Sequence, residues 1–261
     1  MNNNLTSNLI DDLSKDLLKN GYCIFDIENQ VSLELFYKNI QKELDQDDLS
    51  LLHENVSIKD INNLRIKAFR SINKIKNWEN EYTSLGKNLL YHFLGRHLAI
   101  QNKLNLSIQM PNDSSSVLDL HTDALSGQSV FELVMWIPIT RSFDSNAMYI
   151  FKPEVSKEML SEIPKNEKIG MNLLFEKFKD KATFIEINKG KGLLFSPTLF
   201  HGNILNKTSS TRISINCRFK NIFTHEAVSG ERRLGSFYKI LNISEVTKLG
   251  LSYRDDLIKF K

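Results

Sequence analysis

In the segment 211–220, Thr-Arg-Ile-Ser-Ile-Asn-Cys-Arg-Phe-Lys, polar and apolar residues alternate strictly from Arg212 to Lys220. Successive side chains of a β-strand point to opposite faces, so this pattern predicts a strand with one apolar and one polar face. The apolar face consists of Ile213, Ile215, Cys217 and Phe219, and the polar face of Arg212, Ser214, Asn216 and Arg218. A second segment, Leu104–Met110, alternates in the same way and has Gln109 on its polar face.

Two interpretations of the polar faces are open. Most alternating strands belong to a sheet with one face in water. Alternatively, the apolar faces pack under a layer of helices, and the polar faces line the inside of a barrel that holds a polar ligand. In the second case the arginines would provide an anion site, because guanidinium groups bind carboxylates and phosphates in two-pronged fashion.

Outward from these strands the chain divides into three parts, which we expect to form one domain over 1–261. Residues 1–103 lack proline and carry apolar residues at helical spacing, except for an expected strand at Gly21–Ile27. Residues 104–226 have a period of two and are interrupted by one expected helix, Met171–Phe178. Residues 227–261 form a C-terminal extension. The expected fold class is α+β, with a β sandwich or barrel and an N-terminal helical layer.

Composition excludes several classes of protein. The 261 residues are 41% hydrophobic and 25% charged, as in ordinary globular proteins, and the net charge of +3 is too small to drive nonspecific nucleic-acid binding. Two cysteines give no disulfide framework, and the N-terminus lacks a secretory signal, so we expect a cytoplasmic protein. The apolar stretch Val130–Ile139 is too short to insert into a membrane and predicts a buried strand. The oligomeric state is not predictable.

The histidines provide the candidate metal site. If His121 and Asp123 lie on a strand, their side chains point to the same face. Chance alone gives ~0.3 His-x-Asp pairs in a chain of this composition, so the pair by itself is weak evidence. Residues 190–197 predict a turn, a strand and a second turn, which deliver His201 to a new strand with Asn203 on the same side. Two histidines and one carboxylate make the facial triad of non-haem Fe(II) sites, and an arginine eleven residues after His201 suits a dicarboxylate cosubstrate. We expect structural or solvated roles for the other histidines, His53, His92, His97 and His225.

These residues resemble the Fe(II)- and 2-oxoglutarate-dependent oxygenases of the phytanoyl-CoA dioxygenase-like superfamily. The matching motifs are His121-Thr-Asp123, Trp136-Ile-Pro-Ile-Thr140, His201-Gly-Asn203 and Arg212-Ile-Ser214. The resemblance implies a double-stranded β-helix, or cupin-like jelly roll, with His121, Asp123 and His201 as iron ligands. It also implies that Arg212 and Ser214 bind 2-oxoglutarate, and that 2-oxoglutarate and O2 are consumed while substrate carbon is oxidised. The turn expected near Met148–Pro153 departs from the superfamily pattern.

A narrower resemblance covers most of the chain. The runs 121–136, 212–219 and 236–250 are similar to the StrG-like bacterial oxygenases of sporadic carbohydrate-biosynthesis clusters. This resemblance implies a sugar, a sugar-derived molecule or a nucleotide sugar as substrate. Because Asp123 occupies the position that related halogenases leave for chloride, it favours hydroxylation over halogenation. Desaturation, epoxidation and stereoinversion would need the same ligands.

Four further polar residues have two interpretations each. Gln109, Asn203 and Arg218 either contact 2-oxoglutarate or substrate, or satisfy one another's hydrogen bonds inside the barrel. Glu132 interrupts an apolar run and either accepts a substrate hydroxyl or pairs with Arg218.

Two other functions compete with an oxygenase. A non-oxidative sugar isomerase on a cupin barrel would bind metal through similar residues but would not need Arg212. A catalytically silent carbohydrate-binding protein would need neither the triad nor Arg212. A zinc hydrolase is disfavoured, because no His-Glu-x-x-His motif is present.

Overall fold

The computed structural model describes residues 7–163, 170–225 and 232–258. Its strands are β1 (Tyr22–Asp26), β2 (Leu98–Gln101), β3 (Asn105–Gln109), β4 (Glu132–Pro138), β5 (Met148–Ile150), β6 (Thr183–Phe184), β7 (Lys191–Phe195), β8 (His201–Asn203), β9 (Arg212–Asn221) and β10 (Tyr238–Asn242). Its helices are α1 (Ser7–Asn20), α2 (Gln30–Leu44), α3 (Leu52–Asn55), α4 (Ile61–Ile72), α5 (Trp78–Ser84), α6 (Lys87–Leu94), α7 (Pro153–Glu162), α8 (Met171–Phe178) and α9 (Glu245–Ile258).

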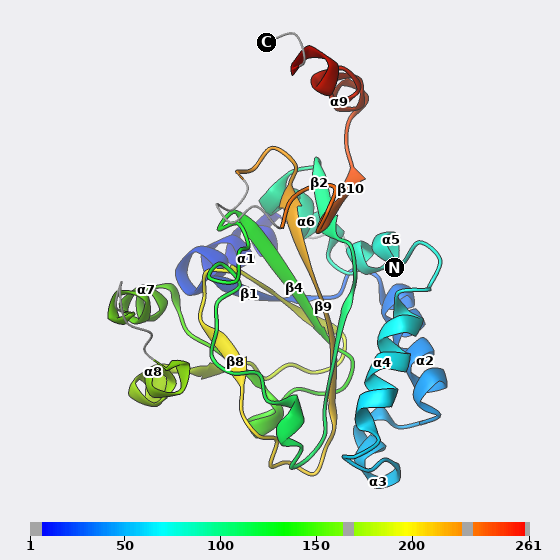
Figure 1. Ribbon diagram of the computed structural model, residues 1–261, viewed down its shortest axis with the longest axis vertical. Coiled ribbons are helices and arrows are strands. Elements are labelled where there is room, and N and C mark those ends of the chain that lie inside the picture. Colours follow the sequence, from blue (N-terminus) through cyan, green and yellow to red (C-terminus); the bar gives the residue numbers. More distant parts are fainter. Residues whose placement is uncertain (1–6, 164–169, 226–231, 259–261) are drawn as a thin grey trace.

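The strands form two antiparallel sheets. The large sheet has the order β1-β7-β4-β9-β2-β10, with β3 also paired to β9, and the small sheet has the order β6-β5-β8. In Figure 1, β8 of the small sheet faces β4 and β9 of the large sheet, with α2 and α4 on the other side of the large sheet at the right and α7 and α8 beyond β8 at the left. The expected mixture of helices and antiparallel sheet is therefore confirmed. Residues 1–103 and 227–261 both contribute strands to the large sheet.

The central strand β9 has the two faces that its sequence predicts. Its apolar residues Ile213, Ile215, Cys217 and Phe219 are fully buried in the core between the large sheet and the N-terminal helices. The rings of Tyr82 and Phe219 stack in this core with centroids 6.2 Å apart. The polar face of β9 points the other way, between the two sheets. The interpretation with an interior polar surface is therefore confirmed.

Some element boundaries differ from expectation. The helical spacing expected up to residue 103 is wrong beyond Leu94. Gly95 adopts a φ of +77° and ends α6, and the chain then enters β2 at Leu98. The expected strand at Val130–Ile139 starts only at Glu132, and Phe131 is 56% exposed. Helix α8 matches the expected range, but α7 was not predicted, although Pro153 favours a helix start.

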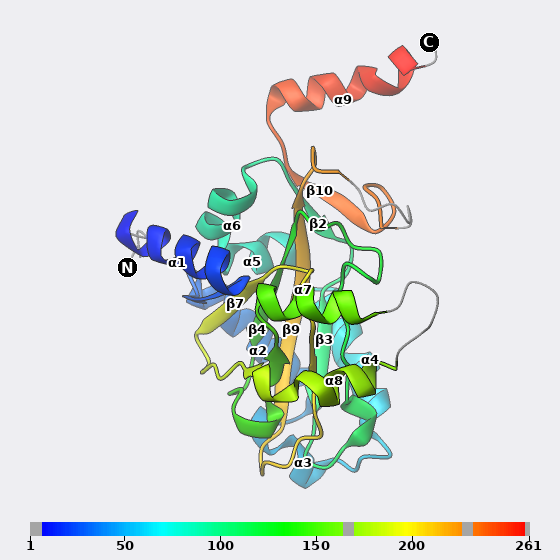
Figure 2. The same cartoon turned by 90° about the vertical axis from the view of Figure 1, so that its left-hand side faces the viewer.

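Helix α9 was not predicted either. It extends away from the two sheets (Figure 2). Among the residues that the structure describes, no helix is long and apolar enough to cross a membrane.

Candidate metal and cosubstrate site

The two histidines of the predicted triad are brought together by a short antiparallel bridge. His201 opens β8, and His121 pairs with it through two backbone hydrogen bonds, of 3.0 Å from the His121 N–H and 2.9 Å from the His201 N–H. The imidazole centroids lie 4.2 Å apart. His201 and Asn203 lie on one strand, as expected.

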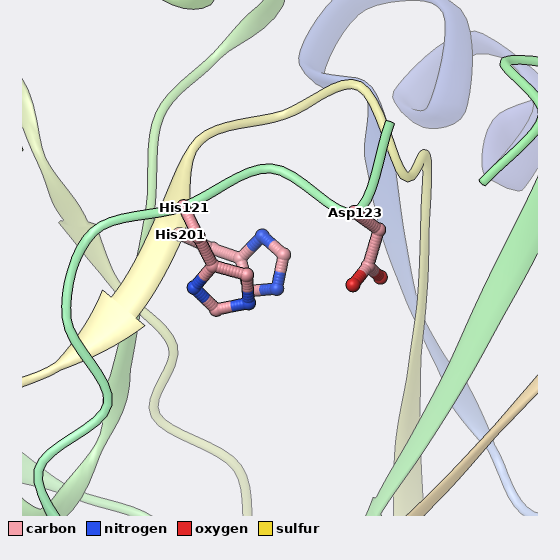
Figure 3. Close-up of side chains that lie close together, drawn as sticks. All are labelled: His121, Asp123 and His201. Carbon is pink, nitrogen blue, oxygen red and sulfur yellow. The ribbon is translucent and has the colours of Figure 1, made fainter. Parts of the chain in front are cut away.

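Asp123 reaches the site differently from the way the sequence suggests. His121 and Asp123 do not lie on a regular strand, because only His121 is bridged and Asp123 begins a turn. The backbone oxygen of Asp123 accepts hydrogen bonds from the N–H groups of Ser126 and Gln128, at 3.0 and 3.1 Å. The turn nevertheless directs the carboxylate toward the imidazoles (Figure 3).

The donor atoms of the triad suit a metal ion. One ligand atom from each of His121, Asp123 and His201 lies within 4.8 Å of the others. The Nδ1 atom of His121 is 2.8 Å from the Asp119 carbonyl oxygen, and that of His201 is 2.9 Å from the Leu199 carbonyl oxygen. A carbonyl oxygen only accepts, so Nδ1 carries the proton and each Nε2 presents a lone pair.

Burial and charge favour the metal-binding protonation states of His201 and Asp123. Burial of His201, with a smaller contribution from the neighbouring His121, lowers the pKa of its imidazole to about 4. Burial of Asp123 acts to raise the pKa of its carboxyl group, but the positive charge of Arg218 and the imidazoles outweigh burial, and the pKa is lowered. Neutral imidazoles and an ionised carboxylate are the ligand forms.

Arg218 binds Asp123 of the triad and does not form the ion pair with Glu132 that the sequence suggested. Its guanidinium binds both carboxylate oxygens of Asp123, at 2.5 and 3.1 Å, and donates a third hydrogen bond to Gln101 Oε1 at 3.0 Å. The interpretation of Arg218 as a group satisfied inside the barrel therefore agrees with the structure. No direct ion pair between Glu132 and Arg218 occurs among the described residues.

Arg212 lies in the same cavity and is almost completely buried, with 2% of its surface exposed. Its Nε and Nη2 donate to Gln109 Oε1 at 3.1 and 2.9 Å, and its Nη1 donates to Ser214 Oγ at 2.9 Å. Among the described residues it makes no ion pair with a carboxylate. Burial lowers the pKa of its guanidinium to about 10, so the group stays charged at neutral pH.

Gln109 and Ser214 therefore hold Arg212 rather than lining the cavity. Gln109 Nε2 also donates to the Ile204 carbonyl oxygen at 2.6 Å, and neither Gln109 nor Ser214 is accessible. These contacts use three of the five guanidinium N–H groups, which leaves two, one on each terminal nitrogen. A carboxylate binds a guanidinium in bidentate fashion through one N–H on each of two nitrogens.

The triad and both arginines line one cavity of about 400 Å³. Several residues that line the cavity were not predicted from the sequence as ligand contacts. These residues are Asn105 and Ser107 from β3, Asn216 from β9, Trp136 from β4 and Phe195 from β7. Asn105, Ser107 and Asn216 could have been predicted, because they lie on the polar faces of the two alternating strands. Trp136 lies with its ring 5.8 Å from the Arg212 guanidinium, which residue spacing alone does not indicate.

Two predicted substrate residues have other partners. Asn203 lines the cavity, but its side chain donates to Ser116 O at 3.1 Å and accepts from Leu118 N at 2.5 Å, so it holds the segment before His121. Glu132 lies outside this cavity and accepts from the Tyr238 hydroxyl at 2.5 Å and from Ser129 N at 3.2 Å. The Glu132 carboxylate is therefore engaged by Tyr238 and Ser129, outside the cavity that holds the triad.

The remaining histidines lie apart from the triad. His53 contacts Thr211, His97 contacts Thr247, and His92 contacts Ser14. Within residues 7–163, 170–225 and 232–258, His121, Asp123 and His201 are the one group of three potential metal ligands.

Comparison with known proteins gives structural matches only. No protein-family profile matches the chain, and no curated protein matches it in sequence. Among solved structures, the chain is similar to the non-heme monooxygenase ThoJ, with a TM-score of 0.56 and 14% identity over 90% of this chain and 85% of that one. It is also similar to the epimerase SnoN in complex with Fe3+, alpha ketoglutarate and nogalamycin RO, with a TM-score of 0.55 and 11% identity over 86% and 88%.

A third similar structure is the alpha ketoglutarate dependent carbocyclase SnoK. It has a TM-score of 0.54 and 11% identity, over 92% of this chain and 97% of that one. At these identities the likeness shows a shared fold. The fold is one that other proteins use for non-heme, alpha ketoglutarate dependent chemistry.

Proposed function

We propose that this protein is an Fe(II)- and 2-oxoglutarate-dependent oxygenase that acts on a small molecule. The observation that carries this proposal is Arg212, a buried cation with two unused N–H groups in the same cavity as a two-histidine, one-carboxylate triad. A buried charge is costly unless a partner of opposite sign approaches it. A dicarboxylate can meet Arg212 with one end and the metal with the other.

The residues present fit the metal that the fold family uses. His121 and His201 would bind Fe(II) through Nε2, because each Nδ1 is held by a backbone carbonyl, and Asp123 would provide the anionic ligand. When bound, iron with 2-oxoglutarate and O2 supplies the oxidation of substrate carbon, while 2-oxoglutarate becomes succinate and CO2. The three protein ligands would leave three coordination positions for cosubstrates.

The protein's own contribution is orientation and exclusion of water. Gln109 and Ser214 fix the plane of the Arg212 guanidinium, so that its free N–H pair meets the distal carboxylate of 2-oxoglutarate. Trp136, 4% exposed, and Phe195, 2% exposed, form apolar walls of the cavity that help to keep water out. We infer from the facing sheets that the strands form a double-stranded β-helix within a single domain over 1–261.

We further propose a sugar or sugar-derived substrate, in line with the StrG-like resemblance. The wall formed by β3 and β9 carries neutral hydrogen-bonding side chains, Asn105, Ser107 and Asn216, which suit hydroxyl groups. Hydroxylation is the reaction we favour. The two cysteines, Cys23 and Cys217, are buried and unpaired, which is in keeping with a reducing, cytoplasmic location.

The cosubstrate site also favours an oxygenase over a non-oxidative cupin isomerase or a silent carbohydrate-binding protein. Neither alternative uses a buried arginine that faces the metal ligands. Anaerobic addition of Fe(II) and 2-oxoglutarate should produce a weak charge-transfer band in the visible, because a chelating keto acid on Fe(II) absorbs there. A protein that binds Fe(II) but shows no band at millimolar 2-oxoglutarate is not an enzyme of this class.

A further inference from the structure

The C-terminal extension reaches the turn that carries Asp123. Strand β10 pairs antiparallel with β2, and Tyr238 lies opposite Gln101 in that register. The Tyr238 side chain is fully buried. It lies among the polar side chains of Gln128 and Glu132, which are 2% and 3% exposed and come from the segment between Asp123 and β4.

The Tyr238 hydroxyl joins these two side chains. It donates its hydrogen to Glu132 Oε2 at 2.5 Å, since a carboxylate only accepts. The Gln128 amide is 2.9 Å from the same hydroxyl oxygen, and with its nitrogen turned toward Tyr238 it donates to that oxygen and satisfies both groups. The hydroxyl is thus used as donor and as acceptor.

Gln128 connects this cluster to the metal ligand. Its backbone N–H donates to the Asp123 carbonyl oxygen at 3.1 Å, so one residue spans the Tyr238 hydroxyl and the Asp123 backbone. A second path leads to the Asp123 side chain: Gln101, opposite Tyr238, accepts from Arg218, which binds the carboxylate. The same strand of the extension therefore supports both the backbone and the side chain of Asp123.

The need for such support follows from the local structure. Asp123 lies in a turn and not in a sheet ladder, so its position depends on hydrogen bonds from the loop. Their hydrogen bonds to Tyr238 also account for Glu132 and Gln128, two buried polar side chains that do not line the cavity of the triad. We propose that Tyr238 is a positioning residue of the metal site, which holds the turn 123–128 so that the Asp123 carboxylate faces His121 and His201.

This inference rests on the proposed metal site, and its test separates the two. The probe is Co(II), titrated into the full-length protein and into a Tyr238→Phe variant, which removes one hydroxyl and keeps the ring. Outer-shell partners of metal ligands contribute 10- to 100-fold in affinity, and Tyr238 acts one residue further out, so we expect about 5- to 10-fold weaker Co(II) binding. Hydrogen exchange of the metal-free protein should accelerate at residues 123–129.

The matched control is Tyr82→Phe. Tyr82 is equally buried, and its hydroxyl donates to the Met135 carbonyl oxygen at 2.7 Å, but it lies in the core under the helical layer. Its loss should lower the melting temperature without changing the Co(II) dissociation constant. If both variants weaken Co(II) binding equally, or if Tyr238→Phe leaves affinity and exchange unchanged, the positioning role is overturned.

Two outcomes need further measurements: a Tyr238→Phe variant that does not fold, and an unmodified protein that binds no Co(II). If Tyr238→Phe does not fold, Gln128→Met cuts the link between Tyr238 and Asp123 but keeps the hydrogen bond from the Tyr238 hydroxyl to Glu132, and it should give the same weaker Co(II) binding. If the unmodified protein binds no Co(II), the proposed function fails. Exchange at residues 123–129 then still decides whether Tyr238 holds the turn.

Discussion

Arg218 binds Asp123 through both carboxylate oxygens, with Nε 3.1 Å from Oδ2 and Nη2 2.5 Å from Oδ1. Each carboxylate oxygen has two lone pairs, so this grip leaves one on each oxygen for a metal ion. The side chains are 13% and 4% exposed, so water does little to weaken the pair. A carboxylate held in this way already has the orientation that the proposed metal site requires.

The pair predicts that Arg218 acts on metal binding. An Arg218→Gln variant should bind Co(II) about 10- to 100-fold more weakly, because Asp123 loses its orientation and the carboxylate loses a partner. Arg218→Lys keeps the charge but not the planar two-pronged geometry, and should fall between the variant and the parent protein. Isothermal titration with Co(II) measures all three.

The control for Arg218 is a second arginine that is partly buried and paired with a buried carboxylate. Arg65 pairs with Asp113, whose side chain is fully buried, and neither residue lines the cavity. Arg65→Gln should therefore destabilise the protein by about 3 to 5 kcal/mol, as expected for a broken buried pair, and leave Co(II) affinity unchanged. Equal losses of affinity in Arg65→Gln and Arg218→Gln would mean that general destabilisation explains the effect.

The imidazole ligands give a spectroscopic prediction. His121→Ala or His201→Ala should abolish the visible band of the anaerobic complex with Fe(II) and 2-oxoglutarate, because each removes one Nε2 donor. His92→Ala is the matched control, since His92 contacts Ser14 on α1 and lies apart from the triad. A full-strength band in both ligand variants is incompatible with the triad.

The effect of removing the Asp123 carboxylate on Co(II) binding should depend on Arg218. Asp123→Gly removes the anionic ligand and leaves the Arg218 charge beside the metal position, so we expect weaker but measurable Co(II) binding and no substrate hydroxylation. The double variant Asp123→Gly with Arg218→Gln also removes the repelling charge. It should bind Co(II) more tightly than Asp123→Gly alone, and a double-mutant cycle measures this coupling. Additive effects would show that the two residues do not act together.

The sequence predicted the elements that carry the proposed cosubstrate site because alternation is a local signal. The two faces of β9 follow from ten consecutive residues, and they place Arg212 inside the cavity and Ile213 in the core. Local signals fail where a distant partner decides the role of a side chain. Glu132 and Arg218 have opposite charges, so the sequence suggested that they pair. In the structure β10 brings Tyr238 to Glu132. The turn at Asp123 brings the Asp123 carboxylate to Arg218 instead.

The same limit applies to His121 and Asp123. Their spacing was read as a strand, whereas the turn at Asp123 is set by hydrogen bonds from Ser126 and Gln128 and by Ala124 N–H donating to Pro197 O at 3.0 Å. Pro197 is 73 residues from Ala124 in the sequence, so spacing alone does not reveal this contact. The predicted residues were correct in position because a turn and a strand can present i and i+2 side chains to the same point.

The two arginines of β9 should separate cosubstrate binding from metal binding. Their backbones are six residues apart on one strand, about 20 Å at ~3.3 Å per residue, and the Arg218 guanidinium is already bound to Asp123 and Gln101, so we expect only Arg212 to bind 2-oxoglutarate. Arg212→Ala removes a charge-assisted bidentate contact and should raise the 2-oxoglutarate requirement by about 2 to 3 kcal/mol, or roughly 30- to 150-fold. Arg218→Ala, assayed at saturating Fe(II), should leave that requirement nearly unchanged. The measurement is uncoupled 2-oxoglutarate decarboxylation against 2-oxoglutarate concentration. A large shift in Arg218→Ala with none in Arg212→Ala would place the cosubstrate at the opposite end of the strand.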